Sequence, residues 1–218
     1  MRRSANTRGF TLIEMLVVLF IIVLITSIVI TGQSNYNKTL LLTDTTYGVA
    51  LSAREAQTFG LASRKYGSVQ NPGYGLHFSS ASPSSYTLFA DINPTLAAPS
   101  NCPLGAVGTP ERKPGNCRFD AADGVVSTYT FSRGFTVTKF CGKSGLTRYC
   151  STDPAPLTTL DLVFTRPNTS TTISGLVNGS LLTSFSCAEI TISDPTKQAN
   201  RVIRLSSIGE ISTGQSCP

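Results

Sequence analysis

Several residue types are missing or rare in this chain, and each absence argues against a class of protein. Tryptophan is absent, histidine occurs once, and charged residues make up 14% of the 218 positions. No charged residue lies between Met15 and Asn37, and no cysteine lies in the first hundred positions. No P-loop, H-E-x-x-H, G-x-S-x-G or nucleotide-binding glycine motif occurs. We therefore expect no catalytic residue, no cofactor and no enzyme activity.

The abundant residue types and the position of the cysteines indicate an exported, loop-rich domain. Serine, threonine, glycine and proline are plentiful, as in folds built from short strands. All six cysteines lie in the last 117 positions, which is typical of an exported domain with paired cysteines. The net charge is +6, but Arg2, Arg3 and Arg8 lie in an expected leader. The remaining charge of about +3 is too small to argue for a nucleic-acid partner.

The N-terminus combines a basic segment with a long apolar one. The first nine residues, MRRSANTRG, are polar and carry only positive charges, whereas Met15 to Ile30 is almost wholly apolar. A helix of about 20 such residues spans the hydrocarbon core of a bilayer. Basic residues before the span keep that end cytoplasmic. The sequence therefore predicts a single-pass membrane helix with an exported C-terminal part.

Two simpler interpretations of this segment leave something unexplained. A secretory signal peptide has a shorter apolar core, and no A-x-A-like site follows Ile30. A plain signal anchor does not account for Glu14, the single acid at the start of the apolar run. An ionisable residue at the rim of a membrane segment is a functional candidate. The helix dipole also favours a carboxylate in a first turn. Glu14 alone therefore does not decide between a functional role and a purely structural one.

Residues Arg8 to Val18, RGFTLIEMLVV, resemble the class III signal of type IV prepilins and type II secretion pseudopilins. In that family a membrane aspartyl peptidase cuts after the glycine, and the new N-terminal aromatic residue is N-methylated. The resemblance implies cleavage between Gly9 and Phe10 and methylation of Phe10. It also implies that Glu14 pairs with the Phe10 amine of a neighbouring subunit, since an unpaired acid buried in a filament costs several kcal/mol.

The resemblance further implies partners and a location. The partners are other pilin or pseudopilin subunits, a prepilin peptidase and an inner-membrane assembly platform. The chain is expected in the bacterial inner membrane with its head in the periplasm, and then in a pilus or pseudopilus. We expect a leader over 1–9, a helix over 10–64 and a β-rich head over 65–218. Within the helix, 10–33 forms the transmembrane and filament-core part and 34–64 is amphipathic.

The expected fold class is α+β, with the long N-terminal helix packed on one antiparallel β head, as in the pilin fold. Helix-compatible sequence continues to about Arg64, and Gly60 or Gly67 is expected to end it. Apolar residues spaced by four, seven and four form a stripe that we expect to pack on the sheet, with a face for partner recognition as the alternative: Tyr36, Leu40, Tyr47 and Leu51.

Alternating segments in the rest of the chain predict strands. They are Tyr74–Phe78, Tyr86–Ala90, Val125–Phe131, Phe135–Phe140, Leu160–Thr165, Glu189–Ser193 and Arg201–Leu205. Asn178-Gly179 predicts a tight hairpin. The proline-rich stretch 91–116 predicts a long loop.

The cysteines are expected to form disulfides rather than a metal site. No C-x-x-C pair occurs, and the single histidine, His77, is expected to be a solvated side chain on a short strand. Six cysteines allow fifteen pairings, of which we favour nearest neighbours. The favoured pairs are Cys102–Cys117, Cys141–Cys150 and Cys187–Cys217.

The C-terminal sequence AEITISDPTKQANRVIRLSSIGEIS resembles the last hairpin of the GspH/FimT family of minor subunits. That resemblance implies a minor pilin or pseudopilin. Some FimT-like members bind DNA through a basic Gly-Arg-x-Arg element, but here Gly209 is followed by Glu210. Arg201 and Arg204 point to opposite faces of a regular strand, which argues against a nucleic-acid surface. A tip adhesin that uses the 91–116 loop is the other alternative.

Overall fold

The computed structural model describes residues 9–218 apart from 63, 95–97, 99–101, 104–113, 168 and 184. The side chains of 31–36 and 182–183 are also outside the description. Most of the leader and much of the proline-rich loop therefore lie outside the described residues. The chain divides into two compact units, residues 1–41 and 42–218.

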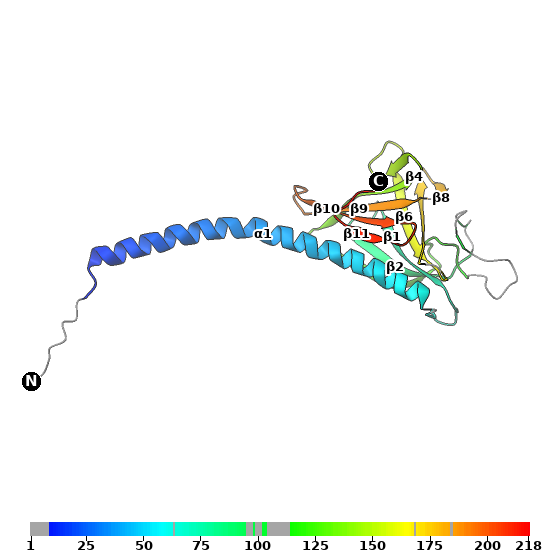
Figure 1. Ribbon diagram of the computed structural model, residues 1–218, viewed down its shortest axis with the longest axis horizontal. Coiled ribbons are helices and arrows are strands. Elements are labelled where there is room, and N and C mark those ends of the chain that lie inside the picture. The colour runs from blue at the N-terminus through cyan, green and yellow to red at the C-terminus, as the bar shows by residue number, and fades with distance from the viewer. Residues whose placement is uncertain are drawn as a thin grey trace, which may run out of the picture. The chain divides into compact units, whose positions relative to one another are not determined.

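One helix, α1, runs from Leu12 to Leu61 and contributes to both units (Figure 1). Its N-terminal part, Leu12–Ile30, has a mean hydropathy of 3.0 over 19 residues and no buried portion, so it is long and apolar enough to cross a membrane. The Thr26 hydroxyl donates to the Ile22 carbonyl oxygen at 2.6 Å. This bond satisfies a polar group that apolar surroundings would otherwise leave unpaired.

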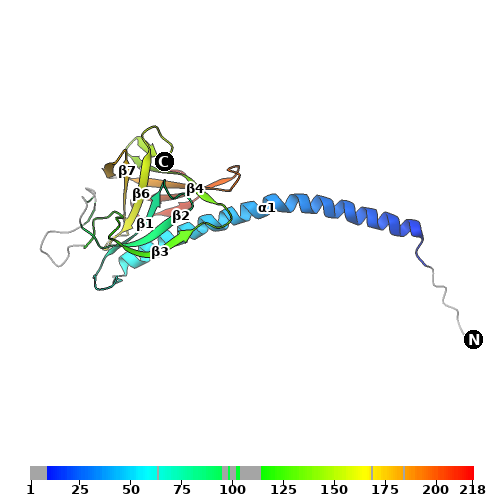
Figure 2. The same ribbon diagram turned by 180° about the vertical axis from the view of Figure 1, so that it is seen from behind.

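The head contains two antiparallel sheets where a single sheet was expected (Figures 1 and 2). The first has the order β3-β2-β1-β6-β7-β8. Its strands are β1 (Gly73–Ser79), β2 (Ser85–Asp91), β3 (Gly124–Thr130), β6 (Leu157–Phe164), β7 (Thr171–Val177) and β8 (Ser180–Thr183). The second has the order β11-β10-β9-β4-β5. Its strands are β4 (Thr136–Ser144), β5 (Thr147–Cys150), β9 (Cys187–Ser193), β10 (Asn200–Ser206) and β11 (Ile211–Thr213).

The α+β class is confirmed, and the chain first crosses from one sheet to the other between β3 and β4. These consecutive strands do not pair, because β4 pairs with β9 instead. Arg133 and Gly134 lie between them with φ values of 56° and 75°. This left-handed backbone redirects the chain from the first sheet to the second.

The predicted packing face of the helix is wrong. Leu40, Tyr47 and Leu51 are 50%, 59% and 70% exposed, and the Tyr36 side chain lies outside the described residues. The buried residues lie on another face: Leu42, Thr46, Val49, Ser52, Ala53, Ala56 and Gly60.

Close approach of backbones explains which face is buried. A Cβ added to Gly60 would lie 2.4 Å from the carbonyl oxygen of Phe164, so only glycine fits there. Ala53 and Ala56 are fully buried. The helix thus turns Ala53, Ala56 and Gly60 toward the sheet, together with Leu42 and Val49, and leaves Tyr47 and Leu51 in solvent.

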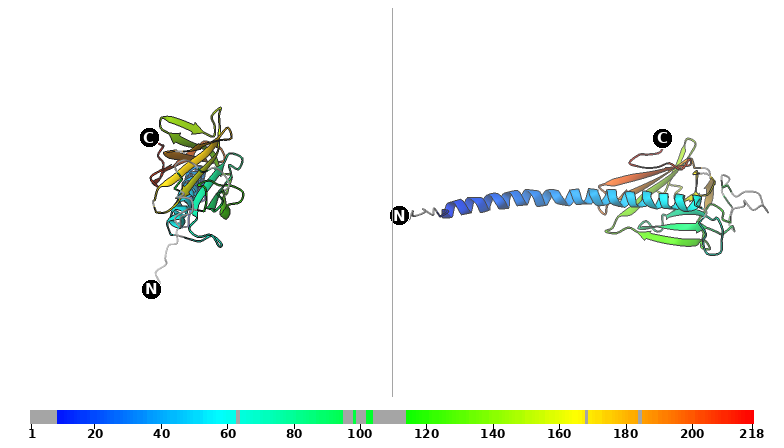
Figure 3. Two further views of the ribbon diagram at one scale, coloured as in Figure 1. Left: turned by 90° about the vertical axis from the view of Figure 1, so that its right-hand side faces the viewer. Right: turned by 60° about the horizontal axis from the view of Figure 1, so that its bottom comes forward.

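Polar contacts fix this part of α1 to the head. The hydroxyls of Ser52 and Tyr86 lie 2.9 Å apart, and the Gln57 amide donates to the Gly209 carbonyl oxygen at 3.2 Å. Tyr86 belongs to the first sheet, whereas Gly209 lies in the turn that leads into β11 of the second. Figure 3 shows this segment of the helix in cyan, lying along the strands. The helix therefore bridges both sheets.

Candidate functional site

The N-terminus of α1 is closed by a reciprocal cap. The Thr11 backbone N–H and hydroxyl both donate to Glu14 Oε2 at 3.0 Å, and the Glu14 N–H donates to the Thr11 hydroxyl oxygen at 3.3 Å. This T-x-x-E arrangement is a capping box, which satisfies N–H groups that a helix start leaves unpaired. It fixes the Glu14 carboxylate at the end of the helix that faces the expected cut.

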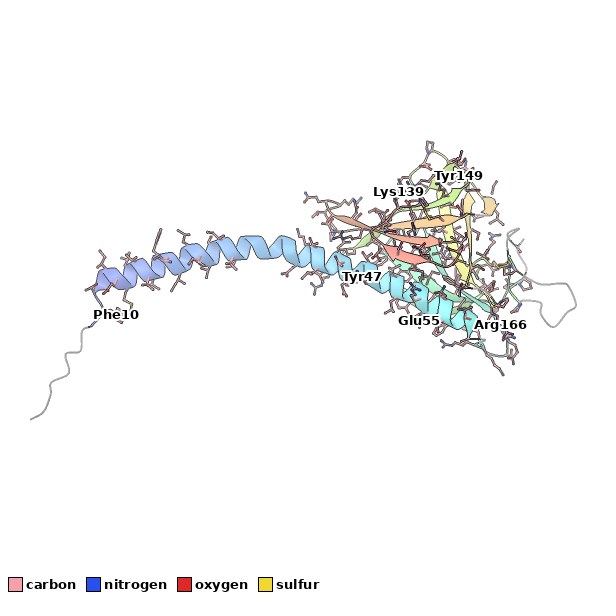
Figure 4. All side chains as sticks on the ribbon, in the orientation of Figure 1. Phe10, Tyr47, Glu55, Lys139, Tyr149 and Arg166 are labelled. Atoms are coloured by element: carbon pink, nitrogen blue, oxygen red, sulfur yellow. A yellow bond between two sulfur atoms is a disulfide. The ribbon has the colours of Figure 1, made fainter. Side chains whose placement is uncertain are left out.

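The residues on either side of the expected cut are accessible. Phe10 is 79% exposed and lies at the start of the helix (Figure 4). Nothing lies within 4 Å of a Cβ added to Gly9. The packing of this chain therefore does not require glycine at position 9.

Glu14 retains capacity for a further partner. Thr11 occupies Oε2, and among the described residues nothing donates to Oε1 and no basic side chain pairs with the carboxylate. A cut between Gly9 and Phe10 creates an amino group four residues before Glu14. Such a cut would leave an acid and an amine at the same end of the apolar helix.

His77 is not the solvated side chain that was expected. Its Nδ1 lies 2.6 Å from Asp161 Oδ1, and the two side chains are 16% and 4% exposed. The β1–β6 register places the two residues directly opposite each other, and the Phe119 ring lies 4.4 Å from the imidazole. Because a buried carboxylate needs a donor, the histidine is drawn into the sheet face. In the described part of the chain, no cluster of three or more His, Cys, Asp or Glu could hold a metal ion.

Three disulfides staple the head, and they join the nearest-neighbour pairs that the sequence favoured. Cys102–Cys117 closes the proline-rich loop, and Cys141–Cys150 joins opposite residues of β4 and β5. Cys187–Cys217 attaches the C-terminal tail to β9. The Cys217 N–H also donates to the buried carboxylate of Glu189, which pairs in addition with Arg148.

A buried acid at the root of the proline-rich loop was not predicted from the sequence. Asp91 is 2% exposed, and its two carboxylate oxygens accept the N–H groups of Asn116 and Cys117 at 2.8 and 2.7 Å. Burial raises the pKa of Asp91 to about 8, although the two N–H donors oppose that rise. The nearby acids Asp123 and Asp120 raise the pKa further. The end of β2 and the residues around Cys117 are thereby tied together.

The C-terminal arginines do not form a joint basic surface. Arg204 is 15% exposed and lies 2.6 Å from Glu210, the residue that follows Gly209. Arg201 is exposed on the same strand. Glu210 therefore neutralises one of the two cations near the chain end.

The family model described as the prokaryotic N-terminal methylation motif matches residues 4–30. The match contains the expected cut, Phe10, Glu14 and the whole apolar part of α1. No curated protein and no solved structure matches the chain. The chain thus carries a type IV pilin-like, prepilin-type signal on an apolar N-terminal helix that is long enough to cross a membrane, with an α+β fold behind it.

Proposed function

We propose that the chain is a minor pilin or pseudopilin, a structural subunit of a type IV pilus or a type II secretion pseudopilus. Cleavage between Gly9 and Phe10 by a prepilin peptidase and methylation of Phe10 precede its assembly. One observation carries the proposal: the matched segment contains Glu14 at the rim of the apolar helix, and a cut after Gly9 would make it the fifth residue of the processed chain.

Before assembly, the apolar part of α1 anchors the chain in the inner membrane with the head in the periplasm. Two observations support this orientation. Positive charges lie only on the leader side of the apolar run, and three disulfides require an oxidising compartment for the head. An assembly platform in the inner membrane then transfers the helix from lipid into a bundle of helices.

In the bundle, Glu14 pairs with the methylated amine of Phe10 on the adjoining copy. An unpaired carboxylate there would cost several kcal/mol, so a subunit shifted along the axis is disfavoured. The capping box supports this role because it already holds the carboxylate at the helix N-terminus. The pair therefore sets the axial register of each subunit.

The C-terminal hairpin favours a minor subunit over a major one. The GspH/FimT resemblance of this hairpin, formed by β9, β10 and the turn at Gly209, supports that choice. A DNA-binding role has less support, because Arg204 is paired with Glu210.

Mass spectrometry of the purified protein tests the processing step. We expect the N-terminal peptide to begin at Phe10 and to carry one additional methyl group. An intact Met1, or a start at any other residue, contradicts the proposal.

A further inference from the structure

A groove of about 710 Å³ lies on the head between α1 and the edge strand β11. Tyr47 and Leu51 line it from the helix, and Ile211 lines it from the strand. Asp44 and Arg54 lie at the two ends of the helical wall. Neither forms an ion pair within the part of the chain that the structure describes. The groove thus has apolar walls and charged ends.

Gly48 leaves space in the middle of this wall. Nothing lies within 4 Å of a Cβ added there, so packing within the chain does not call for glycine. Glycine in a helix interior costs about 1 kcal/mol relative to alanine. Its presence between Tyr47 and Leu51 gives an incoming side chain room to approach the helix backbone.

A matching apolar projection lies elsewhere on the same head. Gly145 and Leu146 form the two-residue turn between β4 and β5, and Leu146 is fully exposed. The Cys141–Cys150 disulfide staples the base of this hairpin. A rigid tip loses little conformational entropy when a partner covers it. The hairpin therefore holds a leucine ready for contact.

The tip cannot fill the groove of its own molecule. In Figure 4, Tyr149 of the hairpin lies near the top of the head, and Tyr47 of the groove lies well apart from it at the lower left. Lys143, close to the tip, forms no ion pair in the described part of the chain, and Asp44 offers it the opposite charge. We propose that Leu146 of one copy inserts into the groove of a second copy, with Lys143 of the first beside Asp44 of the second.

This contact deepens the proposed function, on which it rests. The tip and the groove are different surfaces, so the contact is heterologous and can repeat from copy to copy without closing. Such a contact would join two copies that lie next to each other in a pilus or pseudopilus. It would place head-to-head contacts outside the helical bundle.

Photocrosslinking in the full-length chain tests the contact. A benzophenone amino acid replaces Leu146 in one copy, a tagged wild-type copy is co-expressed in the host, and the filament fraction is irradiated. We expect an adduct between the two copies, with the attachment point in Asp44–Arg54 or Ile211–Thr213. The same probe in place of Ile208 is the matched control, because Ile208 is 73% exposed but does not line the groove.

A charge swap adds a second readout. Lys143→Glu in the probe copy should lower the adduct yield about fivefold, equivalent to about 1 kcal/mol, and Asp44→Lys in the tagged copy should restore it. Three outcomes, each with the subunit present in filaments, overturn this inference but leave the proposed function standing. They are no adduct, an adduct only at another position or with other proteins, and no restoration by Asp44→Lys. A chain absent from filaments overturns the proposed function and the inference with it.

Discussion

At the scale of single residues, Glu14 has two roles that substitution can separate. In this structure it caps the helix, and in the proposed filament it pairs with an amine. Glutamine can still accept the bonds from Thr11 but carries no charge, whereas leucine removes both functions. Thr11→Ala removes the two bonds that the hydroxyl makes in the cap and keeps the charge.

We expect Glu14→Gln and Glu14→Leu to reduce incorporation into filaments by at least about tenfold, because each leaves the amine of Phe10 without its counter-ion. Thr11→Ala should assemble nearly as well as the wild type. The measurement is the ratio of filament-associated to membrane-associated protein in sheared cells. Normal assembly of Glu14→Leu would show that the pairing does not operate.

Asp91 should make the stability of the head dependent on pH. Its pKa is about 8 in the folded chain and near 3.8 without the fold, so the folded state holds a proton that the unfolded state releases between these values. The free energy of unfolding therefore falls as pH rises from about 4 to about 8, by at least about 1 kcal/mol. Urea titrations of the detergent-solubilised protein at several pH values measure this slope.

Asp91→Asn is the matched variant for this slope. It should be less stable than the wild type, because its amide NH2 faces one of the N–H donors at Asn116 and Cys117. Its unfolding free energy should vary less with pH over the same range. Asp123, whose pKa burial also raises, will leave a smaller residual slope of the same sign. An unchanged slope would assign the dependence to other groups.

At the scale of elements, two glycines of α1 should respond in opposite ways to the same substitution. Gly48→Ala adds a methyl group into open space and should stabilise the protein by about 1 kcal/mol. Gly60→Ala would force the helix away from the Phe164 backbone and should cost about 2 kcal/mol. Thermal unfolding of both variants in one detergent gives the comparison, and similar shifts would contradict the helix–sheet packing described here.

Local pattern was enough for most elements but not for the buried face of the helix. Alternation placed β1, β2, β9 and β10 within a few residues of their bounds. The Asn-Gly pair also predicted the turn at Asn178-Gly179, and both residues adopt the positive φ that such a turn needs. The helix face was missed because large apolar residues were counted, whereas the distance to the sheet is set by Ala53, Ala56 and Gly60. Strand β5 was missed because its four residues looked like part of a disulfide loop.

In the candidate site, too, features formed by residues close in the sequence could be predicted, whereas contacts between distant residues could not. The motif around Gly9 and Glu14 is contiguous, so the sequence alone could identify it. The T-x-x-E spacing of Thr11 and Glu14 also signals a capping box, and this signal was overlooked. Asp91 could not be foreseen, because its partners lie 25 and 26 residues away across a long loop.

At the scale of the whole molecule, the order of the strands could not be deduced from the sequence. β1 lies between β2 and β6, and β4 pairs with β9, so neighbours in each sheet come from distant parts of the chain. Alternation reports which side of a strand is buried but not which strand lies next to it. The division into two sheets depends on these long-range choices.

The C-terminal staple should matter for the whole head, since it ties the last residues to the central strand of the second sheet. Replacing Cys187 and Cys217 together by serine should lower the free energy of unfolding by about 2–4 kcal/mol. It should also make the tail after β11 sensitive to protease. Limited proteolysis followed by mass mapping measures the second effect, and a tail that stays protected would mean that Glu189 alone retains it.

The cap at the start of α1 has a consequence for reversibility. In the proposed filament, a subunit that leaves would lose the amine of its neighbour, but the hydroxyl and N–H of Thr11 would travel with it. The Glu14 carboxylate would therefore return to the membrane with two hydrogen bonds from Thr11 already in place. We expect these bonds from Thr11 to lower the free-energy cost of moving the helix back into the membrane. The same carboxylate would then serve both the growth and the disassembly of the filament.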